Sequence, residues 1–286
     1  FNNRGDERFE PGGYLTDYWT DEAVKVIRNN KNRPFFLCLA HWGIHTPLQA
    51  TREDYEAVGD IKPHRLRVYA AMMRAIDRSV GRINDTLADE GLSDNTIVVF
   101  SSDNGGAGYI GLPGVNAPFR GWKLTNFEGG LRVPMFIKWP EKLAPGTRVK
   151  KPVAHIDLMP TLAAAADATI PADVAIDGVD ILPLATGEGG AAWNRNTLFW
   201  QSGYYRVVRH GDWKLQVSDN PDKVWLFNLA DDPTEQNNLA ASEPEKLAEL
   251  QGLLAEHKSS AREPLYPYVA EMPVSIDKSL ATKFVE

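Results

Sequence analysis

The sequence predicts an α/β fold, with a mostly parallel sheet sandwiched by helices and a small antiparallel sheet and helix after it. Two short apolar runs, Pro34 to Ala40 and Thr96 to Phe100, indicate strands buried on both faces. A long helical pattern lies between them, as in the right-handed crossover of a parallel sheet. From about residue 198, short strand-like segments alternate with turn residues, which is typical of an antiparallel sheet.

The first elements are a helix and a buried strand. Thr20 to Glu22 opens a helical pattern with acidic residues suited to a first turn, and Asn29 to Pro34 ends it. The apolar run from Pro34 to Ala40 follows. Its Cys38 is the only cysteine, so no intrachain disulfide forms and we expect Cys38 to be a small core side chain.

The second helix and strand lead into a long loop. After Pro63, apolar residues recur on one helical face until Gly91 supplies a stop. The strand from Thr96 then runs into a loop over 101–130 that is rich in glycine, of the kind that covers active sites. Arg132 to Trp139 indicates another strand. In open α/β sheets ligands bind beyond the C-terminal strand ends, where this loop begins.

The C-terminal part predicts a separate subdomain. We expect residues 1–195 to belong to an α/β domain and residues 196–286 to form a small subdomain with an antiparallel sheet, a helix and an extended tail from about 260. The predicted strands are Thr197 to Trp200, Tyr205 to Arg209, Trp213 to Val217 and Val224 to Leu229, and the predicted helix is Glu243 to His257.

Charge and apolar run length exclude two classes of partner. The net charge of -7 gives no general attraction to a phosphate backbone, so we expect no nucleic acid partner. The longest apolar runs are far shorter than the roughly 20 residues that span a bilayer, so we expect no membrane partner. The sequence leaves the oligomeric state open.

Asp103 and Asn104 are candidate metal ligands, because a carboxylate and an amide oxygen are the hard donors that calcium or magnesium takes. The alternative is a plain turn, since Asp, Asn and Gly favour turns on their own. Lys123, in the glycine-rich loop, is a candidate contact for an anion. Glu128 and Arg132 predict a turn held by an ion pair.

Two histidines follow the first predicted strand. His45 is placed to donate a proton or bind an anion, with a structural role as the alternative. His41 is either a substrate contact or a packing residue. Aromatic residues near the loops are further candidate substrate contacts, because they stack on sugars and aryl groups, although they pack cores as often: Trp42, Tyr109, Trp122 and, beyond these, Tyr204 and Tyr205.

Together these segments resemble the sulfatases of the alkaline phosphatase superfamily. The motifs that carry the resemblance occur in the family's order over roughly residues 15 to 240, and they are Pro34-Phe35-Phe36 with His45-Thr46-Pro47, Ser102 to Gly106, Gly121-Trp122-Lys123, Glu128 to Pro134, Asp157 to Leu162, Gly211 to Lys214 and Asp232 to Leu239. The resemblance implies an alkaline phosphatase-like fold that is incomplete at the N-terminus, with residues 1–195 as the C-terminal part of the catalytic α/β domain. It also implies hydrolysis of an aryl sulfate or a sulfated carbohydrate.

The resemblance also implies roles for single residues. Asp103 and Asn104 would be two of the ligands of a calcium ion, with magnesium as the alternative. His45 would contact the sulfate or its bridging oxygen, and Lys123 would bind a sulfate oxygen. The family's nucleophile is a formylglycine made from cysteine, which attacks sulfur. Family habit also favours a periplasmic or secreted location.

The nucleophile motif is the departure from the family. Cys38 is followed by Leu39-Ala40-His41, which is not the Cys-x-Pro-Ser-Arg motif, so no nucleophile is assigned in this chain. We expect the motif, with formylglycine, in a missing N-terminal part of the same protein, so that this segment alone is inactive. Two alternatives stay open: a phosphonate or phosphate ester hydrolase of the same superfamily, and an inactive binder of sulfated polysaccharide.

Overall fold

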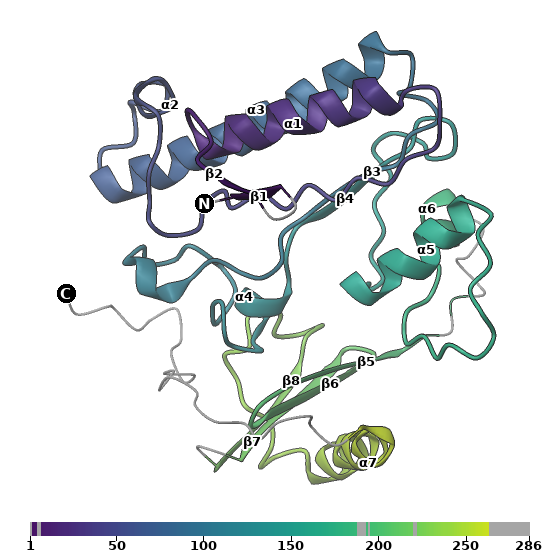
Figure 1. Ribbon diagram of the computed structural model, residues 1–286. Coiled ribbons are helices and arrows are strands. Elements are labelled where there is room, and N and C mark those ends of the chain that lie inside the picture. The colour runs from purple at the N-terminus through teal and green to yellow at the C-terminus, as the bar shows by residue number, and fades with distance from the viewer. Residues whose placement is uncertain (1, 5–6, 188–192, 194, 220–221, 263–286) are drawn as a thin grey trace. The chain divides into compact units, whose positions relative to one another are not determined.

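The computed structural model describes residues 2–4, 7–187, 193, 195–219 and 222–262 (Figure 1). These residues fall into two compact units. One contains the described residues of Phe1–Val99 and Ile137–Ala192, and the other those of Phe100–Phe136 and Trp193–Glu286. The second unit therefore joins the glycine-rich loop to the C-terminal sheet. The predicted boundary between residues 195 and 196 stays a prediction.

The first unit is built on two long helices that lie side by side, α1 and α3 (Figure 1). Helix α1 (Leu15–Asn30) buries Thr16, Thr20, Ala23 and Ile27, which recur on one helical face. It begins earlier than the predicted start at Thr20. Helix α3 (His64–Asp89) confirms the predicted helix between Pro63 and Gly91. At its end the Leu92 amide donates to the Leu87 carbonyl (2.8 Å) and Gly91 has a φ of 71°, so glycine ends the helix as predicted.

Shorter elements complete the first unit. They are β1 (Asn2–Arg4) and β2 (Glu7–Phe9), which pair antiparallel, and the helices α2 (Arg52–Ala57), η2 (His155–Asp157), α5 (Leu158–Ala165) and α6 (Leu182–Thr186). None of the helices within the described ranges is long and apolar enough to cross a membrane.

The run from Pro34 to Ala40 does not form the predicted buried strand. No helix or strand is assigned there, and exposure alternates along the segment, with the Phe36 side chain 79% exposed. Cys38 is exposed, so its predicted place in the core is wrong. The physical reason is that the described residues supply no strand neighbour for this segment, and an apolar run without one has nothing to bury it.

Two other strands appear close to where the sequence predicts them. Strand β3 (Val98–Ser101) and strand β4 (Met135–Lys138) are hydrogen-bonded neighbours in a two-stranded sheet. Both are only partly buried: β3 is half-buried throughout, and exposure alternates along β4. The arrangement is mixed α/β, and the larger parallel sheet stays a prediction.

The second unit contains the predicted antiparallel sheet. Its strands are β5 (Thr197–Ser202), β6 (Tyr205–His210), β7 (Trp213–Asp219) and β8 (Asp222–Asn228), paired antiparallel in that order. Helix α7 (Pro244–Ser260) covers one face through Leu250 and Leu254 (Figure 1). The predicted extended tail after Arg262 lies outside the described residues.

The other face of this sheet is buried under the loop. Phe127 packs on Trp225 and Phe227 of β8, with ring centroids 5.5 and 6.2 Å apart. Leu226, between them in sequence, faces α7 instead, as the two-residue period of a strand requires. The loop also holds η1 (Gly108–Ile110) and α4 (Glu128–Leu131).

Candidate functional site

The first candidate group is the turn that follows β3. Asp103 is exposed and Asn104 is half-buried. Ser102 Oγ donates to the Asn104 carbonyl (2.8 Å), and the Asn104 side-chain amide donates to the Gly105 carbonyl (2.9 Å). These local bonds fix the turn and use the amide nitrogen of Asn104. Its amide oxygen is then the end suited to a cation.

Glycines let this turn lie directly against α4. The Gly105 amide donates to the Gly130 carbonyl (3.0 Å), and a Cβ on Gly105 would stand 1.7 Å from the Gly129 carbonyl oxygen. A Cβ on Gly130 would stand 2.1 Å from the Thr125 carbonyl oxygen. No side chain fits at either distance, so the approach of the turn to α4 requires glycine at position 105, and the approach of α4 to Thr125 requires glycine at position 130.

Lys123 belongs to the same loop structure. Its amide donates to the Gly106 carbonyl (3.2 Å), three residues after Asp103 in the chain. Asn116 fastens this crossing, because its side chain accepts from the Gly106 amide (2.7 Å) and donates to the Gly106 and Gly121 carbonyls (2.9 and 3.2 Å). The structure thus brings the backbone of Lys123 to the turn that carries Asp103 and Asn104.

The predicted aromatic contacts Tyr109 and Trp122 meet edge to face in this loop, with ring centroids 6.1 Å apart. Tyr109 is half exposed, whereas Trp122 is packed over Gly108, where a Cβ would stand 2.7 Å from the indole ring. Tyr109 therefore offers the more accessible ring. Of the other predicted aromatics, Tyr205 is buried in the core beneath Phe127.

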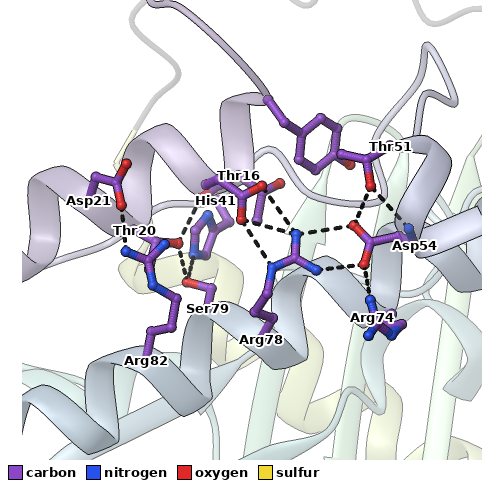
Figure 2. A network of polar contacts seen from close by, with 12 residues as sticks. Thr16, Thr20, Asp21, His41, Thr51, Asp54, Arg74, Arg78, Ser79 and Arg82 are labelled. Atoms are coloured by element: carbon purple, nitrogen blue, oxygen red, sulfur yellow. Dashed lines mark hydrogen bonds and ion pairs between the residues drawn. The ribbon is translucent and has the colours of Figure 1, made fainter. Parts of the chain in front are cut away.

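The remaining predicted residues lie in the other unit, where His41 belongs to a polar network between α1 and α3 (Figure 2). His41 Nε2 lies 2.8 Å from Ser79 Oγ, which lies 2.6 Å from Thr20 Oγ1. Burial lowers the pKa of His41, which favours the neutral imidazole. This environment suits a role in packing better than contact with an anion.

Trp42 and His45 are exposed in the following turn, Trp42 at 74%. The His45 amide donates to the Trp42 carbonyl (3.1 Å), and Ile44 between them has a φ of 61°. His45 Nδ1 lies 2.9 Å from the Thr46 carbonyl, which only accepts, so Nδ1 carries the proton. The imidazolium form would then present a second donor at Nε2.

Three buried charged residues lie together under the loop, and of these the sequence reasoning singled out Glu128 but missed Lys214 and Glu235. Lys214 Nζ lies 2.9 Å from Glu128 Oε1 and 2.8 Å from Glu235 Oε1, and the lysine side chain is 1% exposed. Arg132 lies 3.8 Å from Glu128, so the predicted Glu–Arg pair is present but secondary. Alternation from Trp213 to Val217 places Lys214 on the side of the strand opposite Leu215, which a sequence pattern assigns to solvent, so no local signal marks Lys214 as buried.

The donor set of the described residues fits part of a calcium site. Asp103 and Asn104 offer hard oxygen donors, but calcium takes six to eight oxygens. The described residues contain no group of three or more His, Cys, Asp or Glu side chains placed to hold a metal. Further ligands would have to come from outside them.

Solved structures of other proteins share the fold of this chain. The chain matches the crystal structure of Ps i-CgsB in complex with k-i-k-neocarrahexaose with a TM-score of 0.83 and 32% identity, over 91% of this chain and 58% of that one. The structure named BT33336S-sulf, concerned with glycosaminoglycan metabolism in Bacteroides thetaiotaomicron, matches with a TM-score of 0.73 and 27% identity, over 85% and 54%.

The sequence comparison then gives the family. The profile described as Sulfatase matches residues 1–168, and the one described as N-sulphoglucosamine sulphohydrolase, C-terminal, matches residues 121–263. The chain belongs to the sulfatase family. It is 31% identical to the uncharacterized sulfatase YdeN of Escherichia coli K12, over 98% of this chain and 56% of that protein. It is 35% identical to mouse steryl-sulfatase, over 69% and 32%. The chain thus spans about half or less of these relatives' length.

Proposed function

We propose that this chain is the C-terminal part of a longer sulfuric ester hydrolase, with a sulfated carbohydrate as the favoured substrate class and an aryl sulfate as the alternative. The observation that carries the proposal is the hydrogen bond from the Lys123 amide to the Gly106 carbonyl, which ties the backbone of a cationic residue to the Asp103–Asn104 turn. Membership of the sulfatase family supports the reaction class. The neocarrahexaose in the Ps i-CgsB complex supports the substrate class.

Asp103 and Asn104 would supply two ligands of a calcium ion, and the rest would come from the part of the protein outside this chain. Bound calcium would neutralise negative charge on the sulfate. The Lys123 ammonium would donate a hydrogen bond to a sulfate oxygen and stabilise the charge that develops there. The tie between Lys123 and Gly106 supports this role, because it limits how far the lysine backbone can move from the ligand pair.

His45 would assist departure of the alcohol by donating from Nε2 to the bridging oxygen. The Nδ1 hydrogen bond to the Thr46 carbonyl supports this role, because it orients the ring. Donation from Nε2 requires the imidazolium form, since in the neutral ring the proton is on Nδ1. The nucleophile itself, a formylglycine by resemblance to the family, would lie in the N-terminal part of the protein. A periplasmic or secreted location stays a prediction.

The test is turnover of 4-nitrophenyl sulfate and of 4-nitrophenyl phosphonate by the protein made from its full reading frame. We expect sulfate turnover that falls at least a hundredfold in Lys123→Ala and in His45→Ala, because each removes a donor to developing charge. Lys150→Ala, which changes an exposed lysine in the other unit from Lys123, is the control and should keep full activity. A preference for the phosphonate by orders of magnitude would overturn the sulfatase assignment.

An intact mass measured under denaturing conditions tests whether this chain is part of a longer protein. We expect a species heavier than the 31.8 kDa of this chain, with the mass loss that marks conversion of cysteine to formylglycine. A single unmodified species of 31.8 kDa would contradict the proposal and favour a binder of sulfated polysaccharide.

A further inference from the structure

We propose that Glu128, Lys214 and Glu235 are positioning residues, which set the geometry of the loop that carries Asp103, Asn104 and Lys123. All three are buried in the second unit, and Glu235 is 0% exposed. They come from three separate stretches of chain: Glu128 begins α4, Lys214 lies on β7, and Glu235 lies in the turn after β8. The inference rests on the proposed function only for the statement that this loop binds metal and sulfate. The statement that the three residues set the geometry of the loop does not depend on it.

Glu235 is the centre of the cluster. Its carboxylate accepts from the Glu128 backbone amide (2.6 Å) and pairs with Lys214 Nζ (2.8 Å), while its backbone carbonyl accepts from Arg120 Nη1 (2.9 Å). The Arg120 guanidinium also lies 4.2 Å from the centre of the Phe127 ring. Glu235 therefore holds two points of the loop at once, one at Arg120 and one at the start of α4.

The backbone of Glu235 is held in an unfavourable conformation. Its φ of 59° lies in the left-handed region, which residues with a Cβ rarely adopt. Such a conformation persists where the surroundings over-determine it, and it is concentrated at functional sites. The contacts of Glu235 with Arg120, Glu128 and Lys214 supply those surroundings.

A short path of hydrogen bonds leads from the cluster to the candidate site. Glu128 begins α4, whose Gly129 amide donates to the Arg120 carbonyl (2.7 Å) and whose Gly130 carbonyl accepts from Gly105 (3.0 Å). Gly105 follows Asn104 directly, and Gly106 accepts from Lys123 (3.2 Å). A shift of α4 would therefore move the metal-ligand turn and Lys123 together.

Buried charges are a poor means of adding stability alone. Replacing a buried ion cluster with apolar residues of similar volume is often neutral or stabilising, because apolar side chains avoid the cost of removing charge from water. Directional bonds fix geometry in a way that apolar packing does not. In Glu235, burial raises the pKa despite the opposing charge of Lys214, as expected for a carboxylate held at some cost. A role in positioning the loop explains why Glu128, Lys214 and Glu235 are buried at this place.

The experiment measures amide hydrogen exchange at single residues in the protein made from its full reading frame, together with kcat and KM for 4-nitrophenyl sulfate. In Glu235→Ala we expect exchange at Gly105, Lys123 and Gly129 to accelerate at least tenfold and kcat/KM to fall at least tenfold. Glu235→Gln keeps an oxygen that accepts from the Glu128 amide, so we expect it to restore protection to within about threefold of the parent.

Leu250→Ala is the matched control, because Leu250 is fully buried on the opposite face of the same sheet. We expect it to lower the melting temperature while leaving exchange at the three loop amides and KM unchanged. If Glu235→Ala does not fold, the apolar triple Glu128→Leu, Lys214→Met and Glu235→Leu takes its place, because it leaves no member of the cluster charged and unpaired, and it should fold with a loosened loop. Unchanged loop protection in the variant that folds, or equal loss in Leu250→Ala, would overturn the proposal.

Failure of the proposed function gives a different result. A parent protein that does not hydrolyse the sulfate, but whose loop amides respond to Glu235→Ala as described, would reject the sulfatase assignment and keep the positioning role. A parent protein that hydrolyses the sulfate, but whose loop amides do not respond to Glu235→Ala, would keep the sulfatase assignment and reject the positioning role.

Discussion

Buried charged residues in this chain have several partners each. Asp54, on α2, accepts hydrogen bonds from Arg74, Arg78 and Thr51 (Figure 2). Arg78 also reaches Asp17 of α1 (3.0 Å), so one guanidinium links α1, α2 and α3. A carboxylate buried among several donors is stabilised in its charged form, and removing it leaves those donors unpaired.

Asp54→Asn should lower the free energy of unfolding by about 2 kcal/mol, because hydrogen bonds from charged donors to a buried carboxylate are lost. Chemical denaturation measures this loss. Asp21→Asn, which breaks the exposed pair of Asp21 with Arg82, is the control and should cost less than about 1 kcal/mol. Equal losses in the two variants would contradict the argument.

The same carboxylate predicts a pH dependence. Burial alone would raise the pKa of Asp54, but hydrogen bonds from Arg78, Thr51 and Arg74 outweigh it and lower the pKa below 3.8, its ordinary value. The unfolded chain then binds the proton more tightly than the folded protein, so this contribution to stability is present above about pH 4 and is lost as the pH falls through the folded pKa. Denaturation curves from pH 6 to pH 3 should show a smaller loss of stability in Asp54→Asn than in the parent.

At the scale of elements, the sequence predicts helices and hairpin strands better than it predicts what covers them. Helix α3 and strands β5 to β8 appear where periodicity and turn residues place them, because those signals are local. The run from Pro34 to Ala40 is also apolar, yet it stays partly exposed, because its burial depends on a strand neighbour that no local pattern specifies. Lys214 shows the opposite: it is a charged residue, yet it is buried, because a loop far away in sequence covers it.

The candidate site shows the same difference between features that a local pattern predicts and contacts that join residues far apart in sequence. Asp103, Asn104 and Lys123 could be picked out because each stands in a short motif, and the structure joins their backbones through Gly106. Glu235 could not, because its significance comes from a contact with Glu128, 107 residues earlier. A pattern that covers a few residues carries no information on such a pairing.

Close backbone approach in the loop predicts the effect of adding one methyl group. Gly105→Ala places a Cβ 1.7 Å from the Gly129 carbonyl oxygen, so we expect separation of the turn from α4 and a loss of at least about 2 kcal/mol in stability. Gly252→Ala is the matched control, because nothing lies within 4 Å of its Cβ position on α7. Alanine there should stabilise the helix by about 0.5 to 1 kcal/mol. Thermal denaturation of both variants checks the prediction, and a stable Gly105→Ala protein would contradict it.

At the scale of the whole molecule, the proposed metal site needs more ligands than Asp103 and Asn104, and the described residues hold no group of three or more His, Cys, Asp or Glu side chains placed to bind a metal. Residues 1–286 alone should bind calcium only in the millimolar range, because Asp103 and Asn104 supply few of the oxygens that a tight site needs. The protein made from its full reading frame should bind at least a hundredfold more tightly. Isothermal titration with calcium on both proteins measures the difference, and Asp103→Asn should reduce it. Tight binding by residues 1–286 alone would show that this chain holds a complete site.

The joining of loop and C-terminal sheet in one unit has a consequence for synthesis on the ribosome. Glu128 leaves the ribosome before its partners, and 107 residues of chain separate it from Glu235. At translation rates of about 5 to 20 residues per second, this interval lasts roughly 5 to 20 s. Throughout that time the glycine-rich segment lacks Glu235, and until 86 residues after Glu128 have been added it lacks Lys214 as well. The loop therefore completes its hydrogen bonds with Glu235 only after the C-terminal sheet has been synthesised.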